Sequence, residues 1–345
     1  MKNQLLALGA CALAFLGLTQ EAAAQDDRAG TQAMEELLVP ITPRTIALGS
    51  AITGGLSDLG GVEAVQSNPA ALLASSGTNA MFSRSEYVQD IGINYAGVSQ
   101  SFGANSIALT LLAWDYGDIQ RTTEANPDIN ATTPVTYTAS AYAVGATFGR
   151  QFTDRIGAGF TLKALGRRID EVTSSGVAFD AGVTYVVEES GLRFGVALKN
   201  LGAQMGFSGT GLNRQVPING PSGQQPVAGE IRDLEAQLPS TLNFGASYTR
   251  QFQGDLSVTG LANFQSVSYD LDQYSGGLEL GYANLVFARG GVNFTAEPDQ
   301  DMWQSWNLGA GLNLDLSGTR LKVDYAYRPT NVFGSVNVFS VGIGL

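Results

Sequence analysis

The sequence predicts an all-β protein, a transmembrane antiparallel β-barrel of about 14 strands with an N-terminal hatch or plug. Three observations predict this class. Apolar and polar residues alternate from about residue 80 to the end of the chain. The alternating segments are longer than most strands of globular sheets. Short and long connectors follow these segments in turn, as periplasmic turns and extracellular loops do.

The alternation is clearest near the C-terminus. Every second residue from Trp306 to Leu316 is apolar, and the residues between them are Gly, Asn or Asp. The stretch from Leu321 to Tyr327 repeats the pattern, and Phe339 to Leu345 carries it to the last residue. A soluble sandwich also alternates, but segments of about 10 to 14 residues match tilted membrane-spanning strands. We therefore expect the apolar face to meet lipid and the other face to line a lumen.

Fourteen segments fit this pattern, an even number as single-chain bacterial barrels have. They cover residues 80–87, 91–102, 105–115, 136–152, 155–170, 176–188, 191–201, 241–252, 255–267, 273–283, 285–295, 305–316, 319–328 and 335–345. The connectors after even-numbered segments are short, whereas those after odd-numbered segments include the long ones, 116–135 and 202–240. This parity predicts that the chain enters and leaves the barrel on its periplasmic side and that the long loops are extracellular.

The chain before the barrel divides into two parts. Lys2, the apolar run Leu5–Leu18 and Ala22-Ala23-Ala24 predict a signal peptide over residues 1–25, cleaved near residues 24–25, and hence a location in the cell outer membrane. Residues 26–78 alternate poorly and are rich in Gly, whereas residues 79–345 form the barrel. Because a 14-strand lumen is too wide for side chains alone to fill, we expect 26–78 to be a hatch or plug inside it.

Composition removes several function classes. A formal charge of −12 argues against nucleic-acid binding. The chain has no histidine, and its one cysteine, Cys11, lies in the predicted signal peptide. Ser-His and Cys-His catalysis are therefore excluded, as are histidine- and thiolate-ligated metals. We expect no enzyme activity, no metal and no cofactor.

Several short motifs, in order along the chain, carry a resemblance to a known family. Asn68-Pro69-Ala70-Ala71-Leu72 stands in the predicted hatch, Tyr87-Val88-Gln89-Asp90-Ile91 follows the first strand, and Trp114-Asp115-Tyr116-Gly117-Asp118 ends the third. The chain closes with Asp324-Tyr325-Ala326-Tyr327 and Phe339-Ser340-Val341-Gly342. Together they resemble FadL-like barrels, and within these the PorV/PorQ branch associated with type IX secretion. The terminal Leu345 and the long 202–240 loop depart from that branch.

The resemblance implies two different functions. A PorV-like protein is expected to be an outer-membrane accessory barrel of protein secretion that binds cargo signal domains or a large translocon barrel. A FadL-like protein is expected to pass hydrophobic small molecules across the outer membrane. A structural barrel or surface assembly anchor is a third alternative. The partners that follow are outer-membrane lipid, a translocon with secreted cargo, or a hydrophobic ligand. An importer should show an apolar pocket between hatch and strands and a gap in the wall.

Three sets of residues are candidates for a site. The hatch motif implied by the resemblance is Asn68, Pro69 and Leu72. Residues of the 202–240 loop that could face a partner are Met205 and Phe207. Charges on the predicted lumen face either guide a polar substrate or pair across strands to hold wall and hatch together. They are Lys163, Asp180, Arg193, Arg289, Lys322, Asp324 and Arg328.

Overall fold

A computed structural model describes residues 30–345 except 57–60, 123–126, 128–134, 188–189, 221–222, 233, 253, 269 and 296–304. Of residues 216–220 and 223–226 it describes the backbone but not the side chains. The predicted signal peptide, 1–25, lies outside the described residues.

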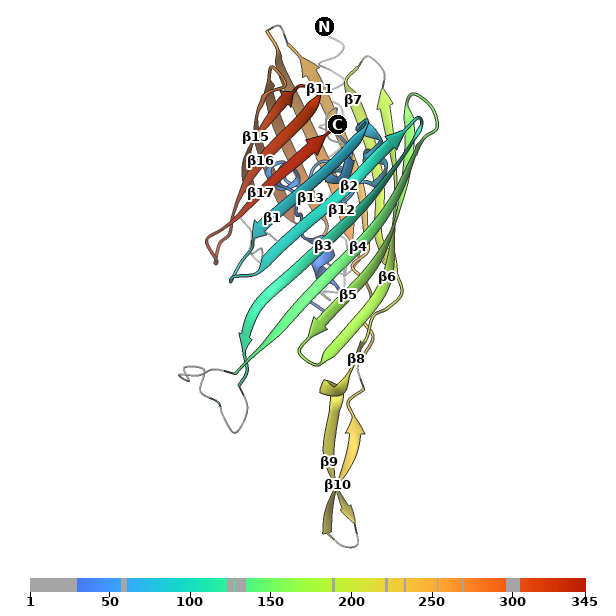
Figure 1. Ribbon diagram of the computed structural model, residues 1–345, viewed down its shortest axis with the longest axis vertical. Coiled ribbons are helices and arrows are strands. Elements are labelled where there is room, and N and C mark those ends of the chain that lie inside the picture. Colours follow the sequence, from blue (N-terminus) through green and yellow to red (C-terminus); the bar gives the residue numbers. More distant parts are fainter. Residues whose placement is uncertain are drawn as a thin grey trace.

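Fourteen antiparallel strands close into one barrel, which confirms the predicted fold class (Figure 1). The first seven are β1 (Thr78–Glu86), β2 (Gly92–Phe102), β3 (Asn105–Gln120), β4 (Thr136–Gln151), β5 (Ile156–Ile169), β6 (Val172–Val187) and β7 (Leu192–Gly202). The others are β11 (Thr241–Gln251), β12 (Leu256–Val267), β13 (Gln273–Tyr282), β14 (Val286–Thr295), β15 (Trp306–Leu316), β16 (Thr319–Pro329) and β17 (Ser335–Gly344). Closure comes from β1 pairing with β17, from Asn79 opposite Gly344 to Glu86 opposite Asn337.

Two strands differ from the alternating segments of the sequence. β3 continues to Gln120 past a bulge between Asp115 and Asp118, where Gly117 has a φ of 68°. The bulge adds one residue, so the alternation changes phase there and hides the end of the strand. β6 begins at Val172 because Asp170, with a φ of 52°, closes a tight turn after β5.

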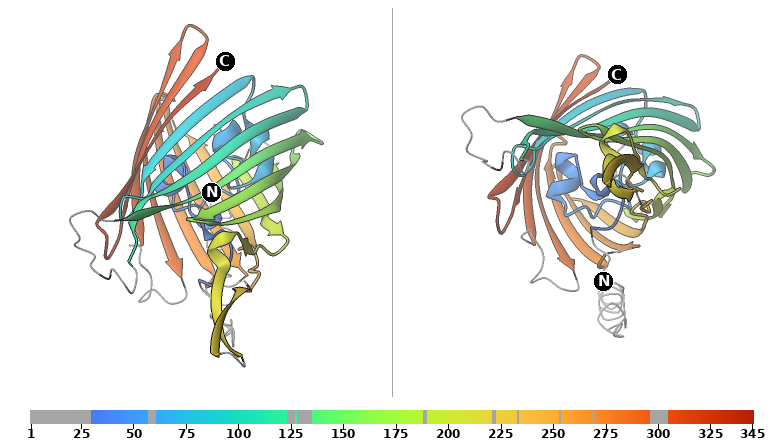
Figure 2. Two further views of the ribbon diagram at one scale, coloured as in Figure 1. Left: turned by 60° about the horizontal axis from the view of Figure 1, so that its bottom comes forward. Right: turned by 90° about the horizontal axis from the view of Figure 1, so that it is seen from below.

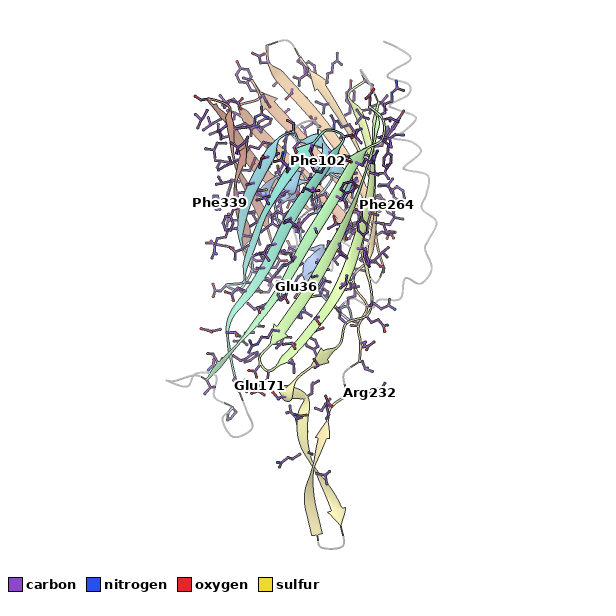
Figure 3. The ribbon with its side chains drawn as sticks, turned by 45° about the vertical axis from the view of Figure 1, so that its right-hand side comes forward. Glu36, Phe102, Glu171, Arg232, Phe264 and Phe339 are labelled. Carbon is purple, nitrogen blue, oxygen red and sulfur yellow. The ribbon has the colours of Figure 1, made fainter. Side chains whose placement is uncertain are left out.

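The two faces of the wall have the chemistry that alternation predicts. Large apolar side chains lie on the outer face of the barrel strands, for example Leu109 (59% exposed) and Phe339 (57% exposed). Figure 3 shows Phe339 and Phe264 pointing away from the barrel. The inward positions of the same strands carry Ser, Thr, Asn, Gly and paired charges, and also buried apolar residues such as Ile93, Leu112 and Trp114. An apolar outer face on a closed barrel fits a lipid environment.

The connector between β7 and β11 has structure of its own. It contains β8 (Phe207–Ser208), the short 3-10 helix η4 (Thr210–Leu212), and a hairpin of β9 (Asn213–Gly220) with β10 (Gly223–Glu230). This hairpin projects beyond the long-loop end of the barrel (Figure 1).

The N-terminal segment lies inside the barrel (Figure 2). Its elements are the 3-10 helix η1 (Glu35–Leu38), the short α-helix α2 (Pro43–Ala47), and the 3-10 helices η2 (Gly61–Glu63) and η3 (Pro69–Ala74). None of the described helices is long and apolar enough to cross a membrane. We refer to the described residues 30–76 as the hatch.

Candidate functional site

The hatch lies directly on wall glycines along one side of the barrel. The carbonyl oxygen of Leu48 would be 2.8 Å from a Cβ added at Gly277, and the amide nitrogen of Gly54 would be 2.5 Å from one at Gly245. The inward glycines whose added Cβ would meet a hatch atom at 2.8 Å or less occupy β5, β6, β7, β11, β13, β14 and β15. They are Gly157, Gly159, Gly182, Gly195, Gly245, Gly277, Gly291 and Gly309. On this side any side chain would displace the hatch.

Asn68 ties the hatch together and to the wall. Its side-chain oxygen accepts a hydrogen bond from the backbone amide of Ala70 (3.0 Å), which caps the first turn of η3. Its side-chain amide donates to the carbonyl of Thr53 (3.0 Å) in the hatch and to that of Val183 (3.2 Å) in β6. Pro69 follows at the first position of η3, and Leu72 is fully buried beneath it. The three predicted hatch residues therefore lie together at the contact between hatch and wall.

Asn68→Ala is expected to loosen the hatch without opening the barrel. It removes a cap and leaves the buried carbonyl of Thr53 without its donor, a cost of about 1–3 kcal/mol. Limited proteolysis of the folded protein should then cut the hatch faster while the strands stay protected. Asn213→Ala, in the exposed hairpin, is the matched control. Equal cutting rates for the two variants would contradict the role of Asn68.

A buried charge network joins α2 to three strands. Arg44 of α2 donates two hydrogen bonds to the carboxylate of Glu279 in β13, both at 3.1 Å. Arg289 of β14 binds the same carboxylate (2.6 Å) and also Asp324 of β16 (2.5 Å). All four side chains are at most 6% exposed. Both guanidinium groups also lie over the ring of Phe287, at 5.8 and 5.3 Å.

Glu63 of η2 lies at the edge of this network. Its carboxylate is 4.0 Å from Arg44, too far for a hydrogen bond. Burial raises the pKa of Glu63 above its usual range, and the charge of Arg44 acts in the opposite direction. Glu63 therefore has an incomplete set of partners inside the barrel.

The other predicted lumen charges occupy inward positions as well. Lys163 of β5 pairs with Asp180 of β6 (2.6 Å) and donates to the side-chain oxygen of Asn200 (2.8 Å). Arg193, Lys322 and Arg328 are partly buried on β7 and β16. Paired charges of both signs across strands match the structural role of these residues better than a path for a charged substrate.

A second polar contact holds η1. Arg167 of β5 pairs with Glu36 (2.5 Å), and the hydroxyl of Tyr116 in β3 donates to the same carboxylate. Glu36 is 96% buried, since only 4% of its surface is exposed. The contact fixes η1 against the wall toward the long-loop end of the lumen.

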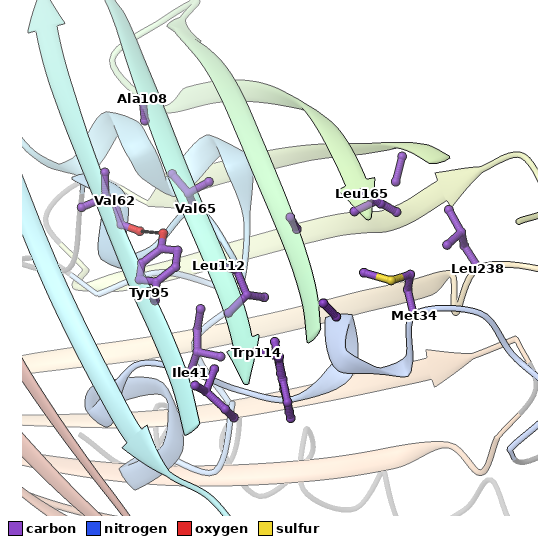
Figure 4. Close-up of a cluster of buried hydrophobic side chains, with 14 of the residues drawn as sticks. Met34, Ile41, Val62, Val65, Tyr95, Ala108, Leu112, Trp114, Leu165 and Leu238 are labelled. Carbon is purple, nitrogen blue, oxygen red and sulfur yellow. Dashed lines mark hydrogen bonds between the residues drawn. The ribbon is translucent and has the colours of Figure 1, made fainter. Parts of the chain in front are cut away.

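Apolar side chains surround η1 in this half of the lumen (Figure 4). Met34 and Ile41 flank η1, and the strands contribute Leu112, Trp114 and Leu165. Tyr87 meets Trp114 edge to face at 5.4 Å between ring centroids. This half of the lumen is therefore apolar, unlike the polar lumen of a water-filled porin.

Two cavities border the hatch at residues 62–67. The lumen cavity, of about 70 Å³, is bounded by Gln66 and Ser67 together with Tyr95, Leu112 and Lys199. The vestibule, of about 420 Å³, lies at the short-turn end and is bounded by Val62 and Glu63 with β1, β15, β16 and β17. The Tyr95 hydroxyl, from the lumen cavity, donates to the carbonyl of Val62 (2.5 Å), which borders the vestibule.

The wall has no gap between any two neighbouring strands of the described barrel. A bulge interrupts β6 and β7 between Phe179 and Ala181, but pairing continues on both sides of it. The lumen cavity lies between hatch and strands, but polar residues such as Thr110, Lys163 and Asn243 make up most of its lining, so it is not the apolar pocket expected of an importer. The expected opening in the wall is absent from the described strands.

The two predicted loop residues have different surroundings. Met205 is 4% exposed and packs on the lumen side of β6, where it would collide with a side chain at Gly176. Phe207 is half-buried in β8, opposite Ser174. Partner docking stays a prediction, and of the two residues only Phe207 has surface to offer.

Sequence reasoning missed Arg44, Glu36, Glu63 and Glu279. The first three lie in the hatch, where no period shows which way a side chain points. The position of Glu279 could have been predicted, because alternation between the outward Leu278 and Leu280 places it on the lumen face. In the part of the chain that the structure describes, no three His, Cys, Asp or Glu side chains gather as a metal site would require.

Comparisons with known proteins support the fold. No family model and no curated protein matches the sequence. Among solved structures, the CymD monoaromatic hydrocarbon channel is similar with a TM-score of 0.57 and 13% identity, over 89% of this chain and 97% of that one. The Ralstonia pickettii toluene transporter TbuX gives 0.51 and 14%, over 88% and 96%. A Pseudomonas aeruginosa FadL homologue gives 0.54 and 12%, over 88% and 98%.

These likenesses correct one expectation. The predicted role as a type IX secretion accessory is wrong, because the similar structures are a monoaromatic hydrocarbon channel, a toluene transporter and a FadL homologue. The motifs behind that prediction have architectural roles here. Asn68 anchors the hatch, Trp114 packs on η1, and Asp324 pairs with Arg289. Such contacts suit any barrel that holds a hatch, so they do not identify a secretion component.

Proposed function

We propose that this protein is a FadL-like outer-membrane channel through which hydrophobic small molecules pass, acting by binding and passage and not by catalysis. The observation that carries the proposal is the apolar lining of the long-loop half of the lumen around η1. The similar solved structures, named as monoaromatic hydrocarbon and toluene carriers, favour the same class of ligand.

The chemistry of the lumen selects for apolar ligands. Leu112, Trp114 and Leu165 offer aliphatic and aromatic surface, and the charges nearest to them, Glu36 and Arg167, are paired with each other. An apolar molecule that enters gains roughly 25 cal/mol for each Å² removed from water. A free ion would lose its hydration there, whereas Glu36 and Arg167 already pair with each other.

Passage requires the hatch to move. The lumen cavity of about 70 Å³ is smaller than the ~150 Å³ that accommodates benzene in a protein interior. The segment around η1 fills the rest of the apolar space and is held by the Glu36–Arg167 ion pair. An entering ligand would take the place of Met34 and Ile41 against the same apolar wall.

Uptake of labelled toluene and benzyl alcohol by cells carrying the protein tests the proposal. Ala143 lines the lumen cavity, whereas its neighbour Val144 faces outward (45% exposed). We expect Ala143→Phe to abolish the uptake gained from the protein and Val144→Phe to leave it unchanged. Heat-dependent gel mobility verifies that both barrels fold. Wild-type protein that raises uptake of neither compound would overturn the proposal.

Two narrower expectations remain predictions. Outer-membrane location after removal of residues 1–25 is tested by fractionation and N-terminal sequencing of the mature protein. Membership of the PorV/PorQ branch finds no support among the similar solved structures.

A further inference from the structure

The same tripeptide stands at the short-turn end of two barrel strands. The end of β4 carries Arg150-Gln151-Phe152, and the end of β11 carries Arg250-Gln251-Phe252. In both copies the guanidinium group lies over the phenylalanine ring, 5.9 Å from the ring centroid for Arg150 and 5.1 Å for Arg250. One short sequence therefore builds the same local arrangement at two places in the wall.

Both arginines face outward, near the edge of the apolar outer face. Arg150 is exposed and lies between the exposed Phe148 and Phe152, so the alternation of β4 places all three on the lipid side of the wall. Arg250 holds the same position between two exposed aromatic residues of β11. Aromatic residues at the ends of barrel strands mark the level where hydrocarbon gives way to lipid headgroups. Each guanidinium group is therefore at the level of the headgroups.

The protein does not neutralise these two charges itself. Among the residues that the structure describes, neither Arg150 nor Arg250 has an ion-pair or hydrogen-bond partner, although each is followed by an aspartate in its turn. The outward Arg84 of β1, in contrast, donates to the side-chain oxygen of Asn94 (3.2 Å). A guanidinium group held at an aromatic ring still offers five N–H donors, and their fork matches the oxygens of a phosphate. Both positions therefore suit a phosphate group from outside the protein.

The surroundings of the arginines indicate a lipid as the source of that phosphate. On the outer face, Phe148 of β4 is paired with Phe160 of β5, and Tyr248 of β11 is paired with Gly260 of β12. No atom lies within 4 Å of a Cβ added at Gly260, so this part of the outer face has room beside Tyr248. An acyl chain that runs from the phosphate toward the middle of the membrane would lie on these residues. A free phosphate ion would gain nothing from them.

We propose that the two Arg-Gln-Phe segments are binding sites for membrane phospholipid, in which Arg150 and Arg250 each bind the phosphate diester of one lipid molecule. Only β5, β6 and β7 lie between β4 and β11, so both sites belong to one side of the barrel. The inward glycines of these strands contact the hatch, and lipid binding therefore supports the same side of the wall from outside. The inference is independent of the proposed passage of hydrophobic molecules.

Native mass spectrometry of the delipidated protein, incubated with dioleoylphosphatidylglycerol, counts the lipids that stay bound. We expect two on the wild type, one on Arg150→Gln or Arg250→Gln, and none on the double variant. Loss of a charge-assisted hydrogen bond to phosphate should lower the occupancy of each site at least about tenfold. Arg84→Gln removes an outward arginine at the long-loop end of β1, and this matched control should keep two lipids. Two lipids on the folded double variant would overturn the proposal.

Two further ligands, tested on the wild-type protein, separate the phosphate from the rest of the lipid. Dioleoylglycerol has the same acyl chains without the phosphate, and glycerol 3-phosphate has the phosphate without the chains. We expect dioleoylglycerol not to be retained and an excess of glycerol 3-phosphate not to displace the bound lipid. Equal retention of dioleoylglycerol would show that the arginines do not form the sites, and displacement by glycerol 3-phosphate would show that a soluble phosphate is the ligand. Either result would overturn the proposal. Toluene uptake should be unchanged in the double variant, so it reports on the proposed function separately.

Discussion

Gly291→Val should loosen the hatch against the barrel wall and make opening of a closed channel more frequent. A Cβ at Gly291 would fall on backbone atoms of Leu48 and Gly49 and would be 2.7 Å from the carbonyl oxygen of Ala47. Backbone cannot rotate away as a side-chain end can, so the hatch must shift as a body. Overpacking of this kind costs about 1–3 kcal/mol. That cost falls on the contact between hatch and wall, because the strand pairing of β14 needs no side chain.

Single-channel recordings in planar bilayers measure the result. We expect wild-type protein to show few conductance steps and Gly291→Val to show large steps more often, since a 14-strand lumen is wide once its hatch has moved. Gly290→Val is the control, one residue away on the outer face of the same strand with no atom nearer than 3.8 Å to the added Cβ. A folded Gly291→Val barrel that conducts no better than Gly290→Val would show that the glycine contact does not seal the lumen.

The wall could be predicted from the sequence because a membrane-spanning strand has only two environments. Each residue of β15 faces either lipid or lumen, so Leu308 and Asn307 reveal their sides by chemistry alone. The same rule left the end of β3 hidden, since the bulge at Asp115–Asp118 exchanges the two sides. The alternation also places glycines such as Gly245 and Gly309 on the lumen face. It does not show that the hatch contacts them.

The hatch could not be predicted beyond its existence. Its short helices have no period, and their positions are decided by contacts with strands more than a hundred residues away. Asn68 bonds Val183, and Arg44 bonds Glu279. The function was misjudged for a related reason. Motifs such as Asn68-Pro69 indicate how a hatch is anchored in a barrel. Barrels with different functions can share such an anchor.

Arg44→Met should cost the folded protein about 3–5 kcal/mol, the penalty for breaking a buried ion pair by removing one partner. The methionine keeps apolar contact with the ring of Phe287, where the guanidinium now lies 5.8 Å from the centroid. Glu279 would retain Arg289, but Glu63 would lose the nearest positive charge, and both carboxylates stay buried. Urea unfolding in lipid vesicles measures the loss. Arg121→Met breaks an exposed pair with Asp170, and its cost should be at most about 1 kcal/mol.

A second substitution separates the charge from the packing. In the double variant Arg44→Met/Glu63→Gln, the uncompensated carboxylate of Glu63 is removed while the shape of its side chain is kept. If burial of unpaired charge is the cause, the double variant should recover part of the lost stability, and the coupling between the two sites should be roughly 0.5–3 kcal/mol. Strictly additive losses would mean that Arg44 stabilises the hatch by its contacts with Glu279 and Phe287 alone. The charge of Glu63 would then not depend on the network around Arg44. Glu63 also borders the vestibule, and its Oε1 has no hydrogen-bond partner.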